Sequence, residues 1–442
     1  MQTTLENLGQ LERRLNVAVP LGEIEGEVQK RLANLAKTVR IAGFRPGKVP
    51  IKMVAQQYGS QVRSDVISDK VNESFSDAVR EQNLRVAGYP RIERKEDGAS
   101  AAADALEFSA VFEVYPDVTI GNVASISIRR PQVDVTPEDV DRTLEVLRKQ
   151  RTTYAAVARG AQAGDRVTVD FSGMIDGVVF PGGQAKDFAI TVGEGRMLPE
   201  FETAVVGLKP GETRSFPLTF PADYHGKEVA GRLAQFDLTV KEVVEPQVPP
   251  LDEAFARAFG IKSGKVDDLR REVEGNLRLE LKRKIEQTIK DQALAGLREK
   301  TQLALPRALV DVETRGLMER TAGRLREQGM KPEDVQLTPD MFAQQASERV
   351  ALGLIVGELV RKEGLQAKPE QVKARVEELA QTYEQPEAVV RWHFEKRERL
   401  AEFEALTVEQ NVVDWVLARA TVVDVPTTFE ALMTPPAQEA GG

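Results

Sequence analysis

The sequence predicts a multidomain protein of the α+β class, and three observations support this. The chain has 442 residues, enough for two to four domains with buried cores. Several alternating, strand-like runs occur up to residue 240, whereas the chain beyond residue 250 has helical spacing almost throughout. Between these parts, Gln247–Pro250 ends in two consecutive prolines and is typical of a linker.

Composition narrows the classes of function. The chain has no cysteine and two histidines, His225 and His393, far apart in sequence. Disulfides and thiolate metal sites are therefore excluded, and we expect neither a metal nor a cofactor. No stretch approaches the roughly 18 apolar residues that a membrane span needs, and the first ten residues lack the pattern of a signal peptide. We expect a soluble, cytoplasmic protein without a membrane contact.

The first segment, residues 1–115, is predicted to be a small α+β domain. Residues 15–19 alternate as in a half-buried strand, and residues 106–114 do so again. Helical spacing covers residues 21–40 and 62–79. The octapeptide Gly43–Pro50 interrupts the helical pattern, so we expect it at an exposed tip between two helices.

Charge sets this tip apart from the rest of the chain, which is formally −9. No acidic residue occurs from Val28 to Ser64, a region that suits a polyanionic partner. Eight cationic residues lie there: Lys30, Arg31, Lys37, Arg40, Arg45, Lys48, Lys52 and Arg63.

Local chemistry within the octapeptide predicts a turn. Pro46 and Gly47 suit the central positions of a type II turn, and Pro50 suits the start of the following helix. Phe44 lies between glycine and arginine, where a large apolar side chain is costly to expose and useful to insert into a partner. The alternative is an ordinary helix–turn–helix connection with a solvated basic face.

A linker is expected over residues 116–150. Its start is irregular and partly extended, and Thr136–Asp139 then predicts a helix with threonine as N-cap and proline at the first helical position. Residues 151–246 alternate again, with Asp176–Gly177 as a hairpin signal and one short helix near 198–206. We expect a compact sheet wrapped around that helix.

Residues 247–433 are predicted to be helical. A long amphipathic helix begins near Val266, and Pro306, Pro339 and Pro369 lie near the starts of further helices. Prolines between long helices suggest protruding arms, although any single leucine here is more readily a core residue than a substrate contact. The tail, residues 434–442, is rich in proline, alanine and glycine, and we expect it to be disordered.

The octapeptide resembles the ribosome-docking signature of the trigger factor family, bacterial chaperones of nascent chains, and the resemblance extends over nearly the whole chain. It implies a ribosome-binding domain at 1–115, a linker at 116–150, an isomerase domain at 151–246, and a helical chaperone domain at 247–433. The implied partners are the large ribosomal subunit at the polypeptide exit (ribosomal protein and rRNA), nascent and unfolded polypeptides, and a second copy off the ribosome. The implied docking residues are Gly43, Phe44, Arg45, Pro46, Gly47 and Lys48.

The middle segment resembles the FKBP-type prolyl isomerase domain through residues 169–173, Asp176–Gly177 and residues 207–212. Phe201 takes the position of the pocket floor, where many relatives have tryptophan. Pro181 stands where many relatives have an aspartate, which puts polar recognition at that position in doubt. Carried over residue by residue, the pocket comprises Phe171, Phe180, Phe188, Met197, Leu198, Phe201, Tyr224 and Phe236, with Tyr224 and His225 at the rim.

An apolar pocket suits prolyl isomerisation. Rotation about an X–Pro bond has a barrier of about 18–20 kcal/mol because amide resonance must be broken. A twisted amide is less dipolar than a planar one, so a water-poor cleft disfavours it less than water does. The reaction needs no general base or nucleophile, in agreement with the scarcity of histidine.

Other readings remain open at this point. The pocket aromatics could simply form a domain core. The chain could be a free prolyl isomerase whose helical part dimerises or binds a folded partner. It could also be an RNA-binding protein that uses the basic tip, although aromatic residues that would stack on bases are sparse there.

Overall fold

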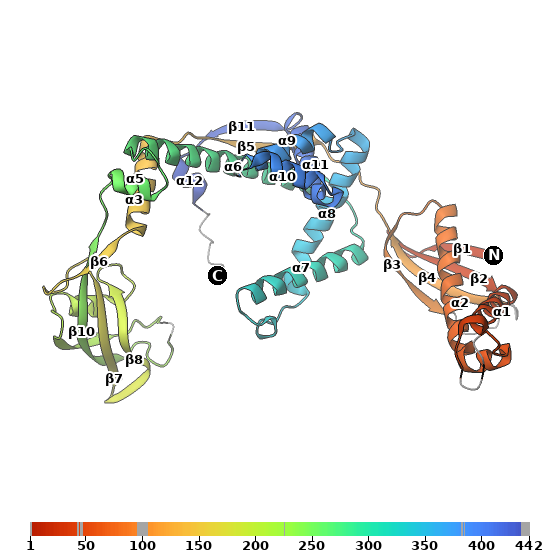
Figure 1. The fold of residues 1–442 in the computed structure, drawn as a ribbon, viewed down its shortest axis with the longest axis horizontal. Helices are drawn as coiled ribbons and strands as arrows, with labels where there is room; N and C mark the ends of the chain where they lie inside the picture. Colours follow the sequence, from red (N-terminus) through yellow and green to blue (C-terminus); the bar gives the residue numbers. More distant parts are fainter. Residues whose placement is uncertain are drawn as a thin grey trace. The chain divides into compact units, whose positions relative to one another are not determined.

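The computed structural model describes residues 2–41, 44, 47–94, 105–224, 226–381, 383 and 385–434. The chain divides into two compact units (Figure 1). One comprises residues 1–130 with 286–425, and the other comprises residues 131–285 with 426–442. Each unit contains antiparallel sheet and helix, so the predicted α+β class is confirmed. The domain boundaries drawn from the sequence remain a prediction.

The N-terminal part of the first unit is an antiparallel sheet packed against two helices (Figure 1). The strands β1 (Gln2–Asn7), β2 (Glu12–Pro20), β3 (Val86–Arg94) and β4 (Ala105–Val114) occur in the order β1-β2-β4-β3. The helices are α1 (Leu21–Thr38) and α2 (Ile51–Glu81). Residues Leu15, Val17 and Val19 are buried, as their alternation predicts.

Two strands of this sheet were not anticipated from the sequence. One is β1, and the other is β3, whose pairing with β4 shifts register between Ala87 and Arg91. Gly88 has φ +79°, and Pro90 follows within the same irregular stretch. Because glycine and proline are typical of turns, the local sequence did not predict a strand here. The strand is stabilised by its pairing with β4, across an irregularity in register.

The helical part of the first unit surrounds a second core. Its elements are the second half of α6 (Val266–Lys300), then α7 (Arg307–Glu327), α8 (Asp340–Glu363), α9 (Pro369–Ala380), α10 (Pro386–Phe394) and α11 (Ala401–Leu417), with 3-10 turns at Pro332–Asp334 and Arg397–Leu400. Pro306 and Pro339 cap helices, and Pro369 begins one, as predicted. Ile355 and Leu359 are buried in this core, so the apolar run 352–360 packs inside.

The linker joins this core from a distant part of the chain. After a 3-10 turn at Val123–Ser125, β5 (Ser127–Gln132) pairs with β11 (Thr421–Pro426). Ile128 of β5 is fully buried beside helical residues such as Leu297 and Val416. The linker is therefore partly an ordered strand, which agrees with its alternating apolar residues.

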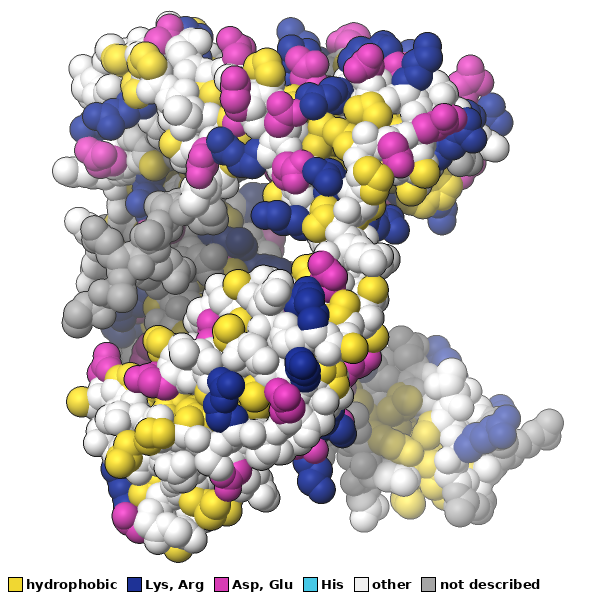
Figure 2. Space-filling view, turned by 90° about the vertical axis from the view of Figure 1, so that its left-hand side faces the viewer, with side chains coloured by type: hydrophobic (Ala, Val, Ile, Leu, Met, Phe, Trp, Pro, Cys, Tyr) yellow, Lys and Arg dark blue, Asp and Glu magenta, His cyan; other side chains and the backbone are white. Residues whose placement is uncertain are grey.

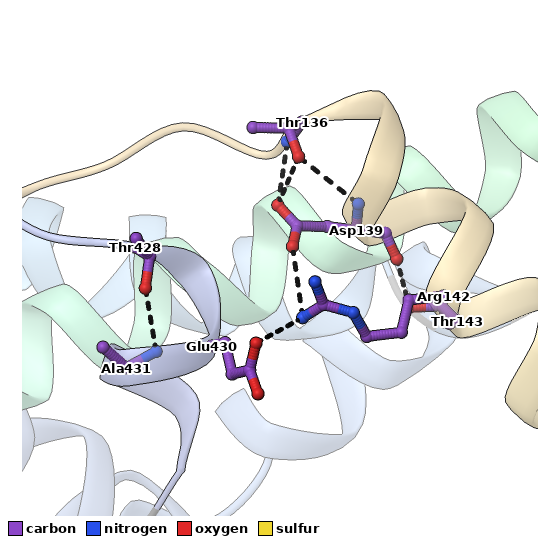
Figure 3. A network of polar contacts seen from close by, with 7 residues as sticks. All are labelled: Thr136, Asp139, Arg142, Thr143, Thr428, Glu430 and Ala431. Carbon is purple, nitrogen blue, oxygen red and sulfur yellow. Dashed lines mark hydrogen bonds and ion pairs between the residues drawn. The ribbon is translucent and has the colours of Figure 1, made fainter.

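In the second unit, α3 (Pro137–Gln150) packs with α5 (Glu253–Ala258) and the first half of α6. Thr136 and Asp139 form the predicted cap of α3 as a reciprocal capping box. The Arg142 guanidinium lies 2.8 Å from a carboxylate oxygen of Glu430, on the short helix α12 (Phe429–Met433), and 3.9 Å from Asp139 (Figure 3). The C-terminal segment is thereby attached to α3.

The remainder of the second unit is a five-stranded antiparallel sheet with one short helix, α4 (Pro199–Val205). Its strands run in the order β6-β10-β7-β8, and β9 also pairs with β10. Asp176 and Gly177 have φ values of 52° and 81°, as the predicted two-residue hairpin requires. The strands are β6 (Thr153–Ala156), β7 (Arg166–Ile175), β8 (Val178–Thr191), β9 (Thr213–Thr219) and β10 (Leu233–Gln247).

Surface chemistry shows no large area of one charge on the face drawn in Figure 2, where acidic and basic side chains interleave. Within the described ranges, no helix is long and apolar enough to cross a membrane.

Candidate functional site

A cavity of about 540 Å³ opens between the sheet and α4 of the second unit. Every residue of the predicted pocket except Phe188 lines it. The structure adds Phe220, Leu218 and Val229, which the sequence comparison with the isomerase family did not single out.

Aromatic rings form the inner wall of this cavity. Phe201 on α4 is 1% exposed, and its ring centroid lies 5.3 Å from that of Phe171 and 5.9 Å from that of Phe236. Phe180 meets Phe236 at 6.1 Å and Phe220 at 5.7 Å, both edge to face. These separations are those of favourable aromatic pairs, so the wall is preformed.

Phe188 lies outside this wall. Its ring packs edge to face on Phe171 at 5.6 Å, and the side chain is 37% exposed. It therefore supports Phe171 from the outer side and does not line the cavity. His225, predicted at the rim, lies outside the described residues.

Gly173 on β7 allows two of these rings to approach the sheet. A Cβ atom at this position would lie 2.6 Å from Cε1 of Phe236 and 3.0 Å from Cε1 of Phe180. Such distances are too short for any side chain to occupy without moving a ring. Gly173 belongs to the stretch that resembles the isomerase family, but the sequence alone assigned it no role in the pocket.

The loop before α4 places Met197 and Leu198 in the cavity. Glu202 on α4 accepts hydrogen bonds from the backbone N–H groups of Gly193 at 3.1 Å and Met197 at 3.4 Å. One carboxylate therefore holds both ends of this short loop. Leu198 immediately precedes α4, so the helix and the loop act as one element.

A buried ion pair supports the start of β7. Asp165 is 2% exposed, and its carboxylate accepts from both Arg159 guanidinium nitrogens, at 2.5 and 3.0 Å, and from the Gln162 N–H at 2.9 Å. The hydrogen bonds from Arg159 hold the pKa of Asp165 below its ordinary value, against the opposing effect of burial. This pair stabilises the domain and does not reach the cavity.

The chemical capacity of the cavity follows from its lining. Of the described residues that line it, Arg196 is charged, Tyr224 carries a hydroxyl, and the others are apolar or glycine. Pro181 lies in the lining, so no carboxylate occupies the position that an aspartate takes in many isomerases. Among its described lining residues the cavity has aromatic rings and no carboxylate, histidine or lysine that could act as a general base, which suits rotation about an amide bond.

The second predicted site is the tip between α1 and α2. Phe44 is 38% exposed, and Gly47 has φ +79°, the left-handed conformation expected after Pro46 in a type II turn. Val49 is 6% exposed and belongs to the domain core, so it anchors the tip. Gly43, Arg45 and Pro46 lie outside the described residues.

Ion pairs divide the cations of this region into two groups. Lys30, Arg31 and Arg63 lie on the helices and pair with carboxylates at 3.5, 2.7 and 2.6 Å. Four others lie at or beside the tip and form no ion pair within the part of the chain that the structure describes: Lys37, Arg40, Lys48 and Lys52. The charge available to a partner is therefore concentrated near Phe44.

Comparison with known proteins identifies the family of the chain. The family model for the bacterial trigger factor protein matches residues 1–147, the model for the trigger factor C-terminus matches 265–418, and that for the FKBP-type peptidyl-prolyl cis-trans isomerase matches 158–241. Trigger factors from Aromatoleum aromaticum and Nitrosospira multiformis are 51% and 49% identical, each over 98% of this chain and 99% of their own length.

The chain belongs to the trigger factor family. It is a chaperone with an FKBP-type peptidyl-prolyl isomerase domain, and the alternative of a free isomerase with an unrelated helical part is not supported. A solved trigger factor structure aligns with 95% of the chain at 17% identity and a TM-score of 0.47, so the assignment depends on the sequence relatives.

The helical part of this trigger factor family member has an aromatic cleft that the sequence did not identify. A cavity of about 530 Å³ is lined by residues including Tyr383, Val389 and Trp392. The tyrosine and tryptophan are 53% and 51% exposed, and the Arg399 guanidinium stacks 3.8 Å from the centroid of the Trp392 indole. Helical spacing alone could not separate these side chains from packing residues.

Proposed function

We propose that this protein docks on the large ribosomal subunit at the polypeptide exit through the tip between α1 and α2. The observation that supports this proposal is Phe44, an exposed aromatic residue next to cations that have no ion pair among the described residues. Lysine and arginine would contact rRNA phosphates, and Phe44 would insert into an apolar site on ribosomal protein. Docking would place the chaperone in the cytoplasm, where nascent chains emerge.

Co-sedimentation with ribosomes tests this proposal. A triple variant, Phe44→Ala, Arg45→Ala and Lys48→Ala, is expected to lose binding at low salt. The control replaces Lys30, Arg31 and Arg63 by alanine, which removes three positive charges, one more than the tip variant removes, from cations that are already paired. Undiminished ribosome binding of the tip variant would contradict the docking assignment.

The isomerase reaction is assigned to the aromatic cavity of the second unit. Support comes from the cavity itself, with Phe201 and Phe236 buried in its wall and neither a carboxylate nor a histidine among the described residues of its lining. A proline ring would occupy the aromatic wall, and the twisted amide would lie in a site poor in water. A cis/trans assay on a proline peptide tests the assignment: Phe201→Leu is expected to lower turnover strongly, and unchanged turnover would remove Phe201 from the site.

The aromatic cleft of the helical part is assigned to unfolded polypeptide. Tyr383 and Trp392 expose large apolar surfaces beside a cavity, and such surfaces are seldom left in water without a partner. A chaperone also gains from weak contacts that accept many sequences. Trp392→Ala is expected to weaken the suppression of aggregation of an unfolded client while leaving isomerase turnover on short peptides unchanged.

We infer that the protein forms a homodimer when it is not bound to the ribosome. The exposed side chains of Phe44, Tyr383 and Trp392 provide apolar surface that a second copy could cover. Sedimentation velocity over a range of protein concentrations tests this. The expected result is a concentration-dependent shift toward twice the mass of the chain, and a constant monomer mass would contradict it.

A further inference from the structure

The edge strand β8 contains a β-bulge beside the isomerase cavity. Its register with β7 shifts between Val169 and Phe171. At this shift two residues of β8, Lys186 and Asp187, lie opposite the single residue Asp170. Asp187 has φ 53°, a left-handed conformation that aspartate tolerates better than most residues. The strand therefore departs from regular geometry at one defined point.

The bulge determines which face of the sheet the later side chains of β8 occupy. Side chains alternate between the two faces of a strand, so one extra residue reverses the alternation. After the bulge, Phe188 lies opposite Val169 and Ile190 lies opposite Val167. Both valines are fully buried, and opposite residues of an antiparallel pair share a face. Without the extra residue, Phe188 and Ile190 would project from the other face.

The side chain of Asp170 holds this bulge from the neighbouring strand. Its Oδ1 atom accepts a hydrogen bond from the backbone N–H of Asp187 at 2.7 Å. The Lys241 ammonium of β10 lies 3.9 Å from the same oxygen and also donates to the Asp187 carboxylate. The positive charge of Lys241 offsets the repulsion between the two carboxylates. One aspartate thus fixes the backbone of the bulge, and one lysine stabilises the pair.

Phe188 connects the bulge to the cavity. It directly follows Asp187, and its ring packs edge to face on Phe171 with 5.6 Å between the centroids. Phe171 lines the cavity and packs in turn on Phe201 at 5.3 Å. A movement of the bulge would therefore shift Phe188 and remove the support from one side of Phe171.

We propose that Asp170 is a positioning residue for the isomerase reaction. By holding the bulge, it keeps Phe188 against Phe171 and so fixes one wall of the cavity before a proline arrives. Asp170 does not line the cavity, so it acts through the two rings. A binding site is preformed only when the side chains that line it are themselves held in place. This inference rests on the proposed assignment of the cavity as the isomerase site.

Isomerase kinetics on a Phe-Pro peptide, at a temperature where every variant is folded, test the inference. Asp170→Ala removes the hydrogen-bond acceptor and is expected to lower kcat/KM by about two- to tenfold. Asp170→Asn keeps an oxygen that can accept from the N–H of Asp187, so it should retain wild-type kcat/KM. Asp237→Ala is the matched control, because this aspartate of β10 accepts from the Ser215 hydroxyl and not from the bulge.

A double-mutant cycle tests whether Asp170 acts through Phe188. Phe188→Ala should lower kcat/KM by a factor similar to that of Asp170→Ala. The double variant should be no slower than the slower single variant, because both changes remove the same support. Losses that multiply in the double variant would overturn the inference, as would wild-type kcat/KM in Asp170→Ala.

Two substitutions of Asp187 test the conformation of the bulge. Both remove the carboxylate that pairs with Lys241. Asp187→Gly tolerates a positive φ and should keep kcat/KM within about twofold of the wild type, whereas Asp187→Val is strained there and should lose as much as Asp170→Ala. Hydrogen exchange at the amide of residue 187 should be faster in Asp170→Ala than in Asp170→Asn. Equal kcat/KM in the glycine and valine variants would contradict the role of the bulge.

Failure of this inference is distinguishable from failure of the underlying site assignment. If the cavity is not the isomerase site, Phe201→Leu will retain turnover. If the cavity is the site but Asp170 does not position its wall, Phe201→Leu will lose turnover while Asp170→Ala keeps it. A circular-dichroism melting curve of each variant confirms that the domain is folded at the assay temperature.

Discussion

The tip between α1 and α2 and the cavity beside α4 are both proposed binding sites with aromatic side chains, but they are built in opposite ways. At the tip, Phe44 projects from a loop among cations that face water. In the cavity, Phe201 is 1% exposed and touches other rings on several sides. The tip would therefore bind by inserting a few exposed side chains into a partner, whereas the cavity would enclose its substrate.

This difference predicts which changes damage folding and which damage binding alone. Side chains at the tip contribute little to the core, apart from Val49. The aromatic residues of the cavity are also members of the core of their domain, so function and stability are coupled there. Variants of the tip should separate the two properties, and variants of the cavity should not.

The largest effect is expected from Phe201→Ala. Removing this buried ring should lower the free energy of unfolding of the domain by about 3–5 kcal/mol and abolish isomerase turnover. Hydrogen exchange of β7 and a peptide assay measure the two effects. Phe188→Ala is the control, because this ring lies outside the cavity and is 37% exposed. Equal losses in both variants would contradict the assigned wall.

A smaller effect is expected from Gly173→Ala, which adds a single methyl group. The new Cβ would lie 2.6 Å from Phe236, so a ring must shift, at a cost of about 1–3 kcal/mol and with a lower kcat/KM. Gly353→Ala on α8 is the matched substitution, since nothing lies within 4 Å of its added Cβ. Normal turnover and stability of Gly173→Ala would show that the rings have room to move.

At the tip, the expected effect is on binding without a change in stability. Lys48→Ala with Lys52→Ala should weaken ribosome binding and reduce the slope of log affinity against log salt by about one to two. Lys30→Ala with Arg63→Ala should do so less, because carboxylates already neutralise those cations. Equal slopes for both pairs would show that the ion pairs open on binding.

The smallest expected effect is a pH dependence in the stability of the domain that contains the cavity. Hydrogen bonds from Arg159 lower the pKa of Asp165, so this pair stabilises the domain fully above about pH 4. That contribution is lost as the pH falls through the lowered pKa. Hydrogen exchange of β7 between pH 6 and pH 3 should detect the loss, and Asp165→Asn should show no such dependence.

Local features of the chain were predictable from sequence. The turn at Gly47, the cap of α3 at Thr136 and the hairpin at Asp176–Gly177 depend on the conformational preferences of a few adjacent residues. The exposure of Phe44 was also predictable, because the residue lies in a turn between two helices. The strand β3 was not predictable in this way, because its glycine and proline are typical of turns. Hydrogen bonding to β4 nevertheless keeps this segment in an extended conformation.

By itself, the sequence determined that the molecule has a basic tip with an exposed phenylalanine, an aromatic-rich domain with a short helix, and a helical C-terminal part. Only the tertiary structure decided which aromatic rings enclose the cavity, which cations are already paired, and that Gly173 must lack a side chain. Each of these depends on residues from different strands or helices meeting at a particular register. The periodicity of one segment contains no information about its distance from another segment. The packing of the elements therefore determines which rings, which ion pairs and which glycine come together.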